Sequence, residues 1–213
     1  MILIEGVAGS GKSTLAEKLH IAALENNISA SWYLEESKDH PVHPHNGKRT
    51  CLSPEYFLNQ WENFISSNFS RNHLFILEGS FFQSTIRFMM VQNNERDISA
   101  YFKKCQSILA GASPKLIYLR PSEISPHIDW IMTKREEVWT EKVSKYLENT
   151  PFFSNSKSKG KYCMREFWSS YASLCDSLVS EAVISSKIIK SGLGSFENQL
   201  NEALRYTNLG QKA

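Results

Sequence analysis

The chain carries Gly6-Val7-Ala8-Gly9-Ser10-Gly11-Lys12-Ser13 near its first residue, in the pattern G-x-x-x-x-G-K-S. Residues 1–5 form an apolar run typical of a buried parallel strand, and apolar residues recur at helical spacing over 13–26. Glycine permits backbone angles and close approaches that a Cβ would block, so the N–H groups of such a loop can turn inward around an anion. The stretch therefore predicts a strand, an anion-binding loop and a helix, in that order.

The residue types in this loop suit a nucleoside triphosphate and its magnesium ion. Lys12 can reach the β- and γ-phosphates, Ser13 can offer its hydroxyl to Mg²⁺, and the positive end of the following helix dipole adds to the attraction. We therefore expect ATP and Mg as cofactors; the alternative is a glycine-rich turn that binds no ligand. The residues expected to contact the nucleotide are Gly6, Ala8, Gly9, Ser10, Gly11, Lys12, Ser13 and Thr14.

Length and composition indicate one ordinary globular domain, which we assign to residues 1–213. A formal charge of +2 gives no reason to expect a nucleic-acid partner. No apolar stretch is long enough to span a bilayer and the first strand leaves no room for a leader, so we expect a cytoplasmic protein without a membrane partner. The four cysteines form no C-x-x-C pair, so neither a zinc site nor a disulfide framework is expected.

Short apolar segments alternate with helical patterns along the rest of the chain. Further strands are predicted at 28–34, 74–77, 115–119 and 187–190, and further helices from 53 and at 82–92, 95–109, 123–147, 164–182 and 195–206. Such alternation implies a mostly parallel sheet with helices on both faces, because right-handed crossovers place them there. Ligands of such sheets bind at the carboxyl ends of the strands, where the glycine loop is expected.

A family resemblance follows from Ile4-Glu5-Gly6-Val7-Ala8-Gly9-Ser10-Gly11-Lys12-Ser13-Thr14. This segment resembles the opening of thymidylate kinases and deoxynucleoside kinases, which belong to the P-loop nucleoside and nucleotide kinase group. Elsewhere the similarity lies in the order of elements. The resemblance implies an α/β three-layer P-loop NTPase fold, with a five-stranded parallel sheet in the order 2-3-1-4-5, flanking helices and a helical lid around 121–165. It also implies transfer of the γ-phosphoryl group of ATP to a nucleoside or nucleotide.

One departure from these kinases concerns the residues after the third strand. Thymidylate kinases usually carry an Asp-Arg pair there and deoxynucleoside kinases a Glu-Arg-Ser, whereas this chain has Glu78-Gly79-Ser80. That arginine commonly helps to bind the acceptor, and Arg87, one or two helical turns later, is a candidate substitute. The missing arginine also leaves open a kinase for a non-nucleotide metabolite or an antibiotic.

Carboxylates follow the second and third predicted strands. In the kinases that this chain resembles, the end of the second strand faces the γ-phosphate, which implies that Glu35 or Glu36 orients the acceptor hydroxyl, with Asp39 as a third candidate. Strand alternation turns only one of Glu35 and Glu36 inward. Glu78 follows four apolar residues, so we expect it to emerge beside the glycine loop and either to orient Mg²⁺ together with Ser13 or to act as a base. The alternative for each acid is a solvated loop residue.

The basic helical region 123–147 resembles the lid of these kinases, which implies that it closes over the phosphates. Arg135 is the expected lid cation, with Lys134 or Arg120 as assistants, and the alternative is a solvated helix face. The predicted catalytic set is Lys12, Glu35, Glu36, Glu78 and Arg135.

Several other side chains have a functional and a plain interpretation. Prolines at 41 and 44 keep the segment that carries His40, His43 and His45 extended, so no fixed ligand geometry favours a metal site there. The nearness of these histidines to Glu35 and Glu36 favours acceptor binding or loop gating instead. The other candidates are Phe81, Phe82 and Gln83, as the frame of an aromatic acceptor or as core, and the lysines at 157, 159 and 161, as a closing or a surface loop.

The expected partner is a small-molecule acceptor, and a homodimer is left open. A nucleotide-dependent switch or ATPase with a protein partner is the rival from another class. The sequence contains neither the guanine-reading N-K-x-D motif nor the transporter signature L-S-G-G-Q, which disfavours the common versions of that rival.

Overall fold

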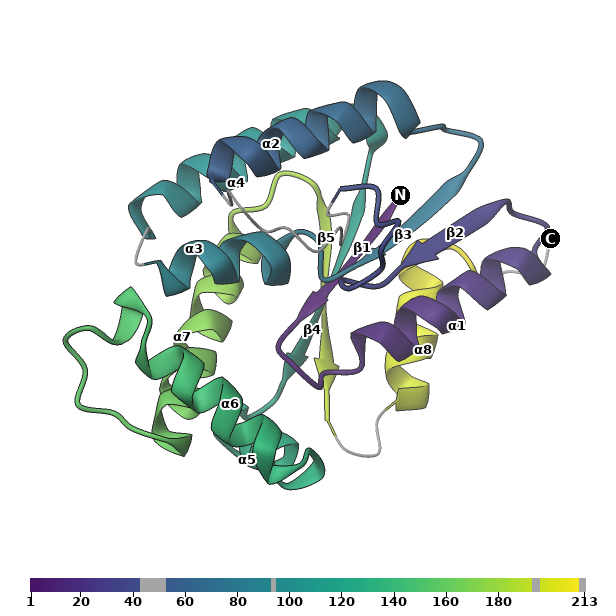
Figure 1. Ribbon diagram of the computed structural model, residues 1–213. Coiled ribbons are helices and arrows are strands. Elements are labelled where there is room, and N and C mark those ends of the chain that lie inside the picture. The colour runs from purple at the N-terminus through teal and green to yellow at the C-terminus, as the bar shows by residue number, and fades with distance from the viewer. Residues whose placement is uncertain (43–52, 93–94, 193–195, 211–213) are drawn as a thin grey trace.

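The computed structural model describes residues 1–42, 53–92, 95–192 and 196–210. These residues contain an all-parallel sheet of five strands in the order β2-β3-β1-β4-β5, drawn as arrows in Figure 1. The predicted α/β fold and its strand order are thereby confirmed. The strands are β1 (Ile2–Gly6), β2 (Ala30–Tyr33), β3 (Leu74–Glu78), β4 (Lys115–Pro121) and β5 (Ser185–Ser191).

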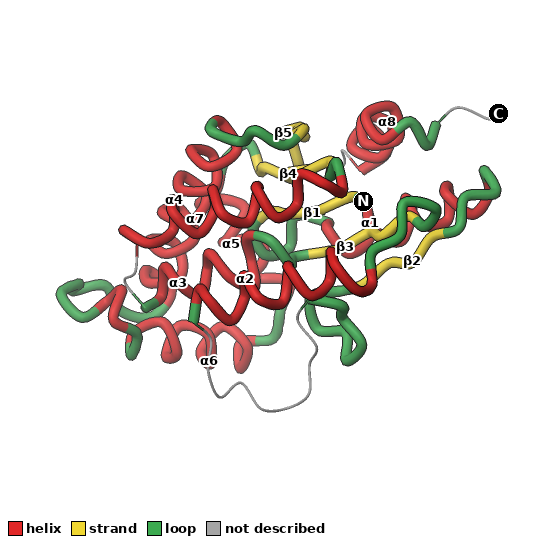
Figure 2. Tube along the Cα trace, turned by 90° about the horizontal axis from the view of Figure 1, so that it is seen from above, coloured by secondary structure: helices red, strands yellow, loops and turns green. Residues whose placement is uncertain are grey.

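The central strand β1 is buried along its whole length because helices cover both faces of the sheet. Its side chains alternate between two cores: Leu3 belongs to one, and Ile2 and Ile4 belong to the other. Figure 2 shows the strands passing between two groups of helices. α1 (Lys12–Glu25) and α8 (Phe196–Thr207) lie on one side. On the other side are α2 (Pro54–Asn63), α3 (Arg87–Val91), α4 (Glu95–Leu109) and α7 (Lys161–Ser180).

The stretch predicted as one helix over 123–147 is instead two helices. α5 (Ile124–Lys134) ends at Arg135, whose extended backbone (φ −94°, ψ 154°) redirects the chain before α6 (Glu137–Glu148) begins. The break lets both helices pack against α7, as Figure 1 shows below the sheet. A 2.6 Å ion pair between Asp129 and Arg165 also joins α5 to α7.

Two other predicted helices differ in their local geometry. The stretch 82–92 begins with a wider π-helical turn, η2 (Phe82–Ile86), before α3 continues it. Likewise α2 ends in the π-helical turn η1 (Phe64–Asn68). Short 3₁₀ turns, η3 (Ala110–Ala112) and η4 (Pro151–Phe153), complete the described elements.

Cys105, Cys163 and Cys175 are free thiols, and Cys51 lies outside the described residues. Among the helices that the structure describes, none has the length and apolar character needed to cross a membrane.

Candidate active site

The glycine loop joins β1 to α1 at the carboxyl edge of the sheet. Gly9 has a φ of +71°, and a Cβ built there would come within 2.8 Å of Ile131 in α5. The loop therefore passes so close to α5 that a side chain at Gly9 would collide with it. Within the described contacts, the N–H groups of Gly9, Gly11 and Lys12 donate to no protein carbonyl. The loop thus presents main-chain donors at the start of a helix, where an anion is favoured.

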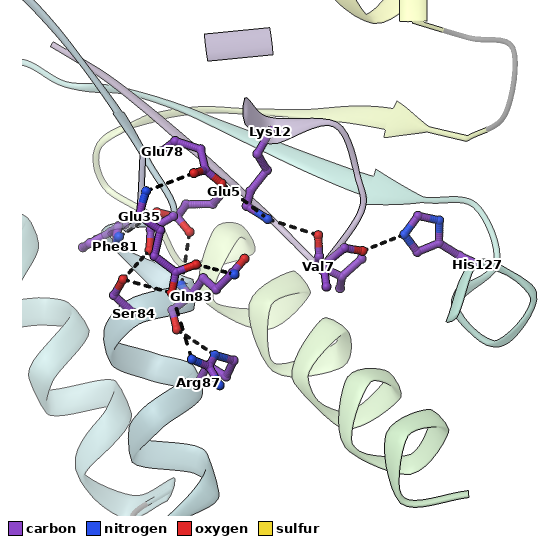
Figure 3. Close-up of polar contacts among 12 residues, drawn as sticks. Glu5, Val7, Lys12, Glu35, Glu78, Phe81, Gln83, Ser84, Arg87 and His127 are labelled. Carbon is purple, nitrogen blue, oxygen red and sulfur yellow. Dashed lines mark hydrogen bonds and ion pairs between the residues drawn. The ribbon is translucent and has the colours of Figure 1, made fainter. Parts of the chain in front are cut away.

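Lys12 is a buried cation, only 5% exposed, at the start of α1. Its Nζ donates to the carbonyl oxygen of Val7 at 3.2 Å and lies 3.7 Å from Oε1 of Glu78. A buried charge needs such partners, because desolvation of an isolated ammonium is costly. The ammonium is consequently held over the loop, and Figure 3 shows it between Glu78 and Val7.

Hydroxyl groups surround the same loop. Ser10 is buried, and its Oγ has no hydrogen-bond partner among the described residues. Ser13 and Thr14 are exposed and line the cavity in front of the loop. These amides and the buried hydroxyl of Ser10 have no hydrogen-bond partner among the described residues, so the loop fits a phosphate ligand.

Glu35 and Glu78 meet where β2 and β3 end side by side. The N–H of Glu35 donates to Oε2 of Glu78 at 3.1 Å. The Glu35 carboxylate in turn accepts hydrogen bonds from Nε2 of Gln83 and Oγ of Ser84. Burial raises the pKa of Glu35, opposed by the nearby cations Arg87 and Lys12. Figure 3 shows Glu35 lying among these side chains, and Glu36 is exposed beside it on the cavity wall.

Gly79, directly after Glu78, has a left-handed backbone conformation. Its φ is +67°, and a Cβ there would lie 3.2 Å from Cβ of Glu35, so this position is occupied by the side chain of Glu35. Arg87 is a cation close to Glu35. Its guanidinium lies 4.0 Å from Oε1 of Glu35, and its Nε donates to the carbonyl of Gln83 at 3.0 Å.

Glu5 is a buried acid for which the sequence predicted no role. Its carboxylate accepts the N–H groups of Phe81 at 2.6 Å and of Gln83 at 3.2 Å, and so fixes the start of η2 to the end of β1. Burial raises its pKa to about 8, against the opposing effect of these hydrogen bonds and of Lys12. A glutamate at the end of an otherwise apolar strand is the signal that could have identified it.

A cavity of about 480 Å³ brings most of the predicted residues together. Its lining consists of Ala8, Gly9, Gly11, Lys12, Ser13, Thr14, Leu34, Glu35, Glu36, Glu78, Gln83 and Arg135. Gly6 and Ser10 belong to the same loop but do not line this cavity. Arg135, in the break between α5 and α6, lies over the ring of Trp139 at 4.6 Å.

Other candidates lie elsewhere. Arg120 pairs with Asp176 at 2.9 Å, and neither Lys134 nor Asp39 lines the cavity. Phe81 and Phe82 are fully buried and stacked.

His40 is buried and accepts the N–H of Val42 at 3.1 Å, whereas His43 and His45 lie outside the described residues. The lysines at 157, 159 and 161 are exposed, and none of them is in the described lining of the cavity. Lys159 forms an ion pair with Glu148 at 3.8 Å.

A second cavity, of about 200 Å³, also adjoins the glycine loop. It is lined by Gly9, Ser10, Gly11, His127, Trp130, Gly192, Phe196 and Gln199. His127 donates from Nε2 to the carbonyl of Ala8 at 2.9 Å, and burial lowers its pKa, which favours the neutral ring. His127 and Trp130 were not predicted as site residues, because their helical spacing looks like that of an ordinary amphipathic helix.

Among the described residues, no group of three or more His, Cys, Asp or Glu side chains is arranged to hold a metal ion. Comparison with models of known protein families gives no match, and comparison with curated proteins gives none either. The described residues establish an α/β chain with a five-stranded parallel sheet, an architecture compatible with a P-loop NTPase.

Proposed function

We propose that this chain is an ATP- and Mg²⁺-dependent phosphotransferase of the P-loop nucleoside and nucleotide kinase type, which moves the γ-phosphoryl group to a small-molecule acceptor. The observation that carries the proposal is that one cavity holds the glycine loop, a buried lysine, two hydroxyls and three carboxylates. Phosphoryl transfer depends mainly on positioning and on charge stabilisation, which are the properties that this set provides.

The phosphate end of the site is the glycine loop. Its unpaired amides and the start of α1 attract the β- and γ-phosphates, and Lys12, already desolvated, adds a positive charge. Ser13 and Glu78 would hold the magnesium ion, which typically keeps several waters and needs only one or two protein ligands besides the phosphates. When bound, the ion neutralises charge that develops on the phosphate oxygens.

The acceptor end of the site is the wall formed by the residues after β2. Glu35 is the better candidate for accepting the hydrogen bond of the acceptor hydroxyl, because its raised pKa makes it a stronger base than an exposed carboxylate. Glu78, next to Lys12, is then left to orient the metal. Arg135 projects from the junction of α5 and α6 and provides a cation at the lid side of the cavity.

The second cavity fits the base of the nucleotide. It adjoins the same loop at Gly9, Ser10 and Gly11, and its wall includes the aromatic rings of Trp130 and Phe196. Aromatic faces favour stacking with a flat heterocycle. A nucleotide would therefore place its base in this cavity and its phosphates along the glycine loop.

The test compares Lys12→Ala with Lys18→Ala, a matched change on the exposed side of α1. Calorimetric titration with ATP and magnesium should show weakened binding for Lys12→Ala and unchanged binding for Lys18→Ala, because only Lys12 lines the cavity. Transfer from γ-labelled ATP should fall by about 10²-fold or more in Lys12→Ala. Equal ATP binding and equal turnover in the two variants would contradict the proposal, and ADP release that no acceptor stimulates would favour the switch or ATPase.

A further inference from the structure

The charges on the cavity wall are divided between its two ends. The described lining contains two cations, Lys12 and Arg135, and both belong to the phosphate side, one at the start of α1 and the other on the lid. The wall after β2 contributes Glu35 and Glu36. A bound polyphosphate would engage Lys12 and Arg135, so within the described part of the wall an acceptor would meet charged groups that are acids.

Arg87 does not change this charge balance. It is not part of the described lining, and its guanidinium lies against Oε1 of Glu35 while its Nε is bonded to the carbonyl of Gln83. Its charge therefore offsets that of Glu35. Glu36 is exposed and has no ion pair among the described residues, so it leaves the described part of the acceptor wall with a net negative charge.

Gln83 makes the same wall rich in hydrogen-bond acceptors. Its Nε2 donates to Glu35, which fixes the orientation of the carboxamide. Its Oε1 is buried and has no partner among the described residues. A buried carbonyl oxygen without a partner calls for a donor, so the bound acceptor should bring an N–H or O–H group to this point.

We infer that the acceptor is an amino alcohol, a hydroxyl compound that also carries a protonated amine. An ammonium group satisfies both Glu36 and the lone pairs of Gln83, whereas a phosphorylated acceptor such as a nucleoside monophosphate would place an anion against acids. The inference rests on the proposed phosphotransferase function and narrows its substrate class.

In the proposed transfer step, these groups account for the bond that forms, the bond that breaks and the proton. The acceptor oxygen attacks the γ-phosphorus, so a new P–O bond forms and the bond from that phosphorus to the β–γ bridging oxygen breaks. ADP leaves with the electron pair of the broken bond. The hydroxyl proton passes to the Glu35 carboxylate and then to solvent.

A fractionated pool of candidate acceptors tests the substrate class directly. A small-molecule cell extract is separated by charge at pH 7 into anionic, neutral and cationic fractions, and each is incubated with the full chain, magnesium and γ-labelled ATP. Label should appear in products of the cationic fraction and should be absent with Lys12→Ala. Label only in the neutral or anionic products would overturn the inference and leave the phosphotransferase proposal standing. Label in no fraction would contradict that proposal, and the inference with it.

A charge variant tests the assigned wall. Glu36→Gln should lower the rate with the cationic fraction by roughly 3- to 10-fold at low ionic strength and much less at high salt, because an exposed carboxylate is screened. The KM for ATP should stay unchanged. Asp39→Asn is the matched control, since Asp39 is also exposed but does not line the cavity. Equal rates for the two variants would overturn the role of Glu36.

Discussion

Glu5 places a completely buried carboxylate between the glycine loop and the start of η2. Its two backbone hydrogen bonds fix the segment that carries Gln83, and Gln83 in turn contacts Glu35. Glu5, which is not in the described lining of the 480 Å³ cavity, thus positions a residue that is. The network exists only in the folded chain, because Phe81 lies 76 positions and Gln83 lies 78 positions after Glu5 in the sequence.

The raised pKa of Glu5 predicts a specific dependence of stability on pH. Between about pH 5 and pH 8 the folded state holds a proton on Glu5 that the unfolded state has released, so stability falls as the pH rises. Glu5→Gln should reduce the magnitude of this slope by on the order of 1 kcal/mol per pH unit, as measured by urea unfolding across that range. Glu35 contributes in the same direction and should leave a residual slope.

Glu17→Gln, on the exposed side of α1, is the control and should leave the slope unchanged. A slope that is the same in both variants would contradict the burial of an ionisable Glu5.

At the scale of the element, α2 is a helix whose first residue can be predicted from the sequence. Ser53 followed by proline predicts an N-cap and a first turn, and the structure confirms both: Oγ of Ser53 accepts the N–H of Tyr56 at 3.2 Å.

The strand predicted at 187–190 is shorter than β5 (Ser185–Ser191), because the polar first residues of β5 gain their strand geometry only by pairing with β4.

Replacement of this cap gives a prediction for the helix. Ser53→Ala should lower the free energy of unfolding by about 1 kcal/mol, since the N–H of Tyr56 loses its partner. Chemical denaturation measures the change. Ser66→Ala, an exposed site beyond the end of α2, should alter stability by less than about 0.5 kcal/mol. Equal losses at the two positions would argue against the cap.

Tertiary contacts determine the elements that the sequence did not specify. The break at Arg135 lies within a continuous helical pattern, and it follows from the packing of α5 and α6 on α7. The role of Arg87 depends on η2, where a π-helical turn brings its guanidinium toward Glu35. The alternation of strands and the spacing of the glycine loop are local properties, so the sheet and most of the cavity lining could be predicted from them.

At the scale of the whole molecule, the sheet separates two cores, and β1 contributes side chains to each. Leu3 packs among α2, α4 and α7 residues, whereas Ile4 packs among those of α1 and α8. These neighbouring residues therefore share few partners although they are adjacent in sequence.

Independent cores predict additive effects on stability. Leu3→Ala should cost about 2–5 kcal/mol and Ile4→Val about 0.5–1.5 kcal/mol, because each shortens a fully buried side chain. The double variant should lose the sum within about 0.5 kcal/mol, as measured by urea unfolding. A clear excess or deficit would show that the two cores respond as one.

The central place of β1 has a consequence for synthesis on the ribosome. Its neighbours β3 and β4 occur at Leu74–Glu78 and Lys115–Pro121, long after β1 itself has been made. A nascent chain that ends before β4 holds an apolar strand with one edge unpaired, and such edges attract other chains. Chaperone capture during translation should therefore be strongest before β4 emerges from the exit tunnel.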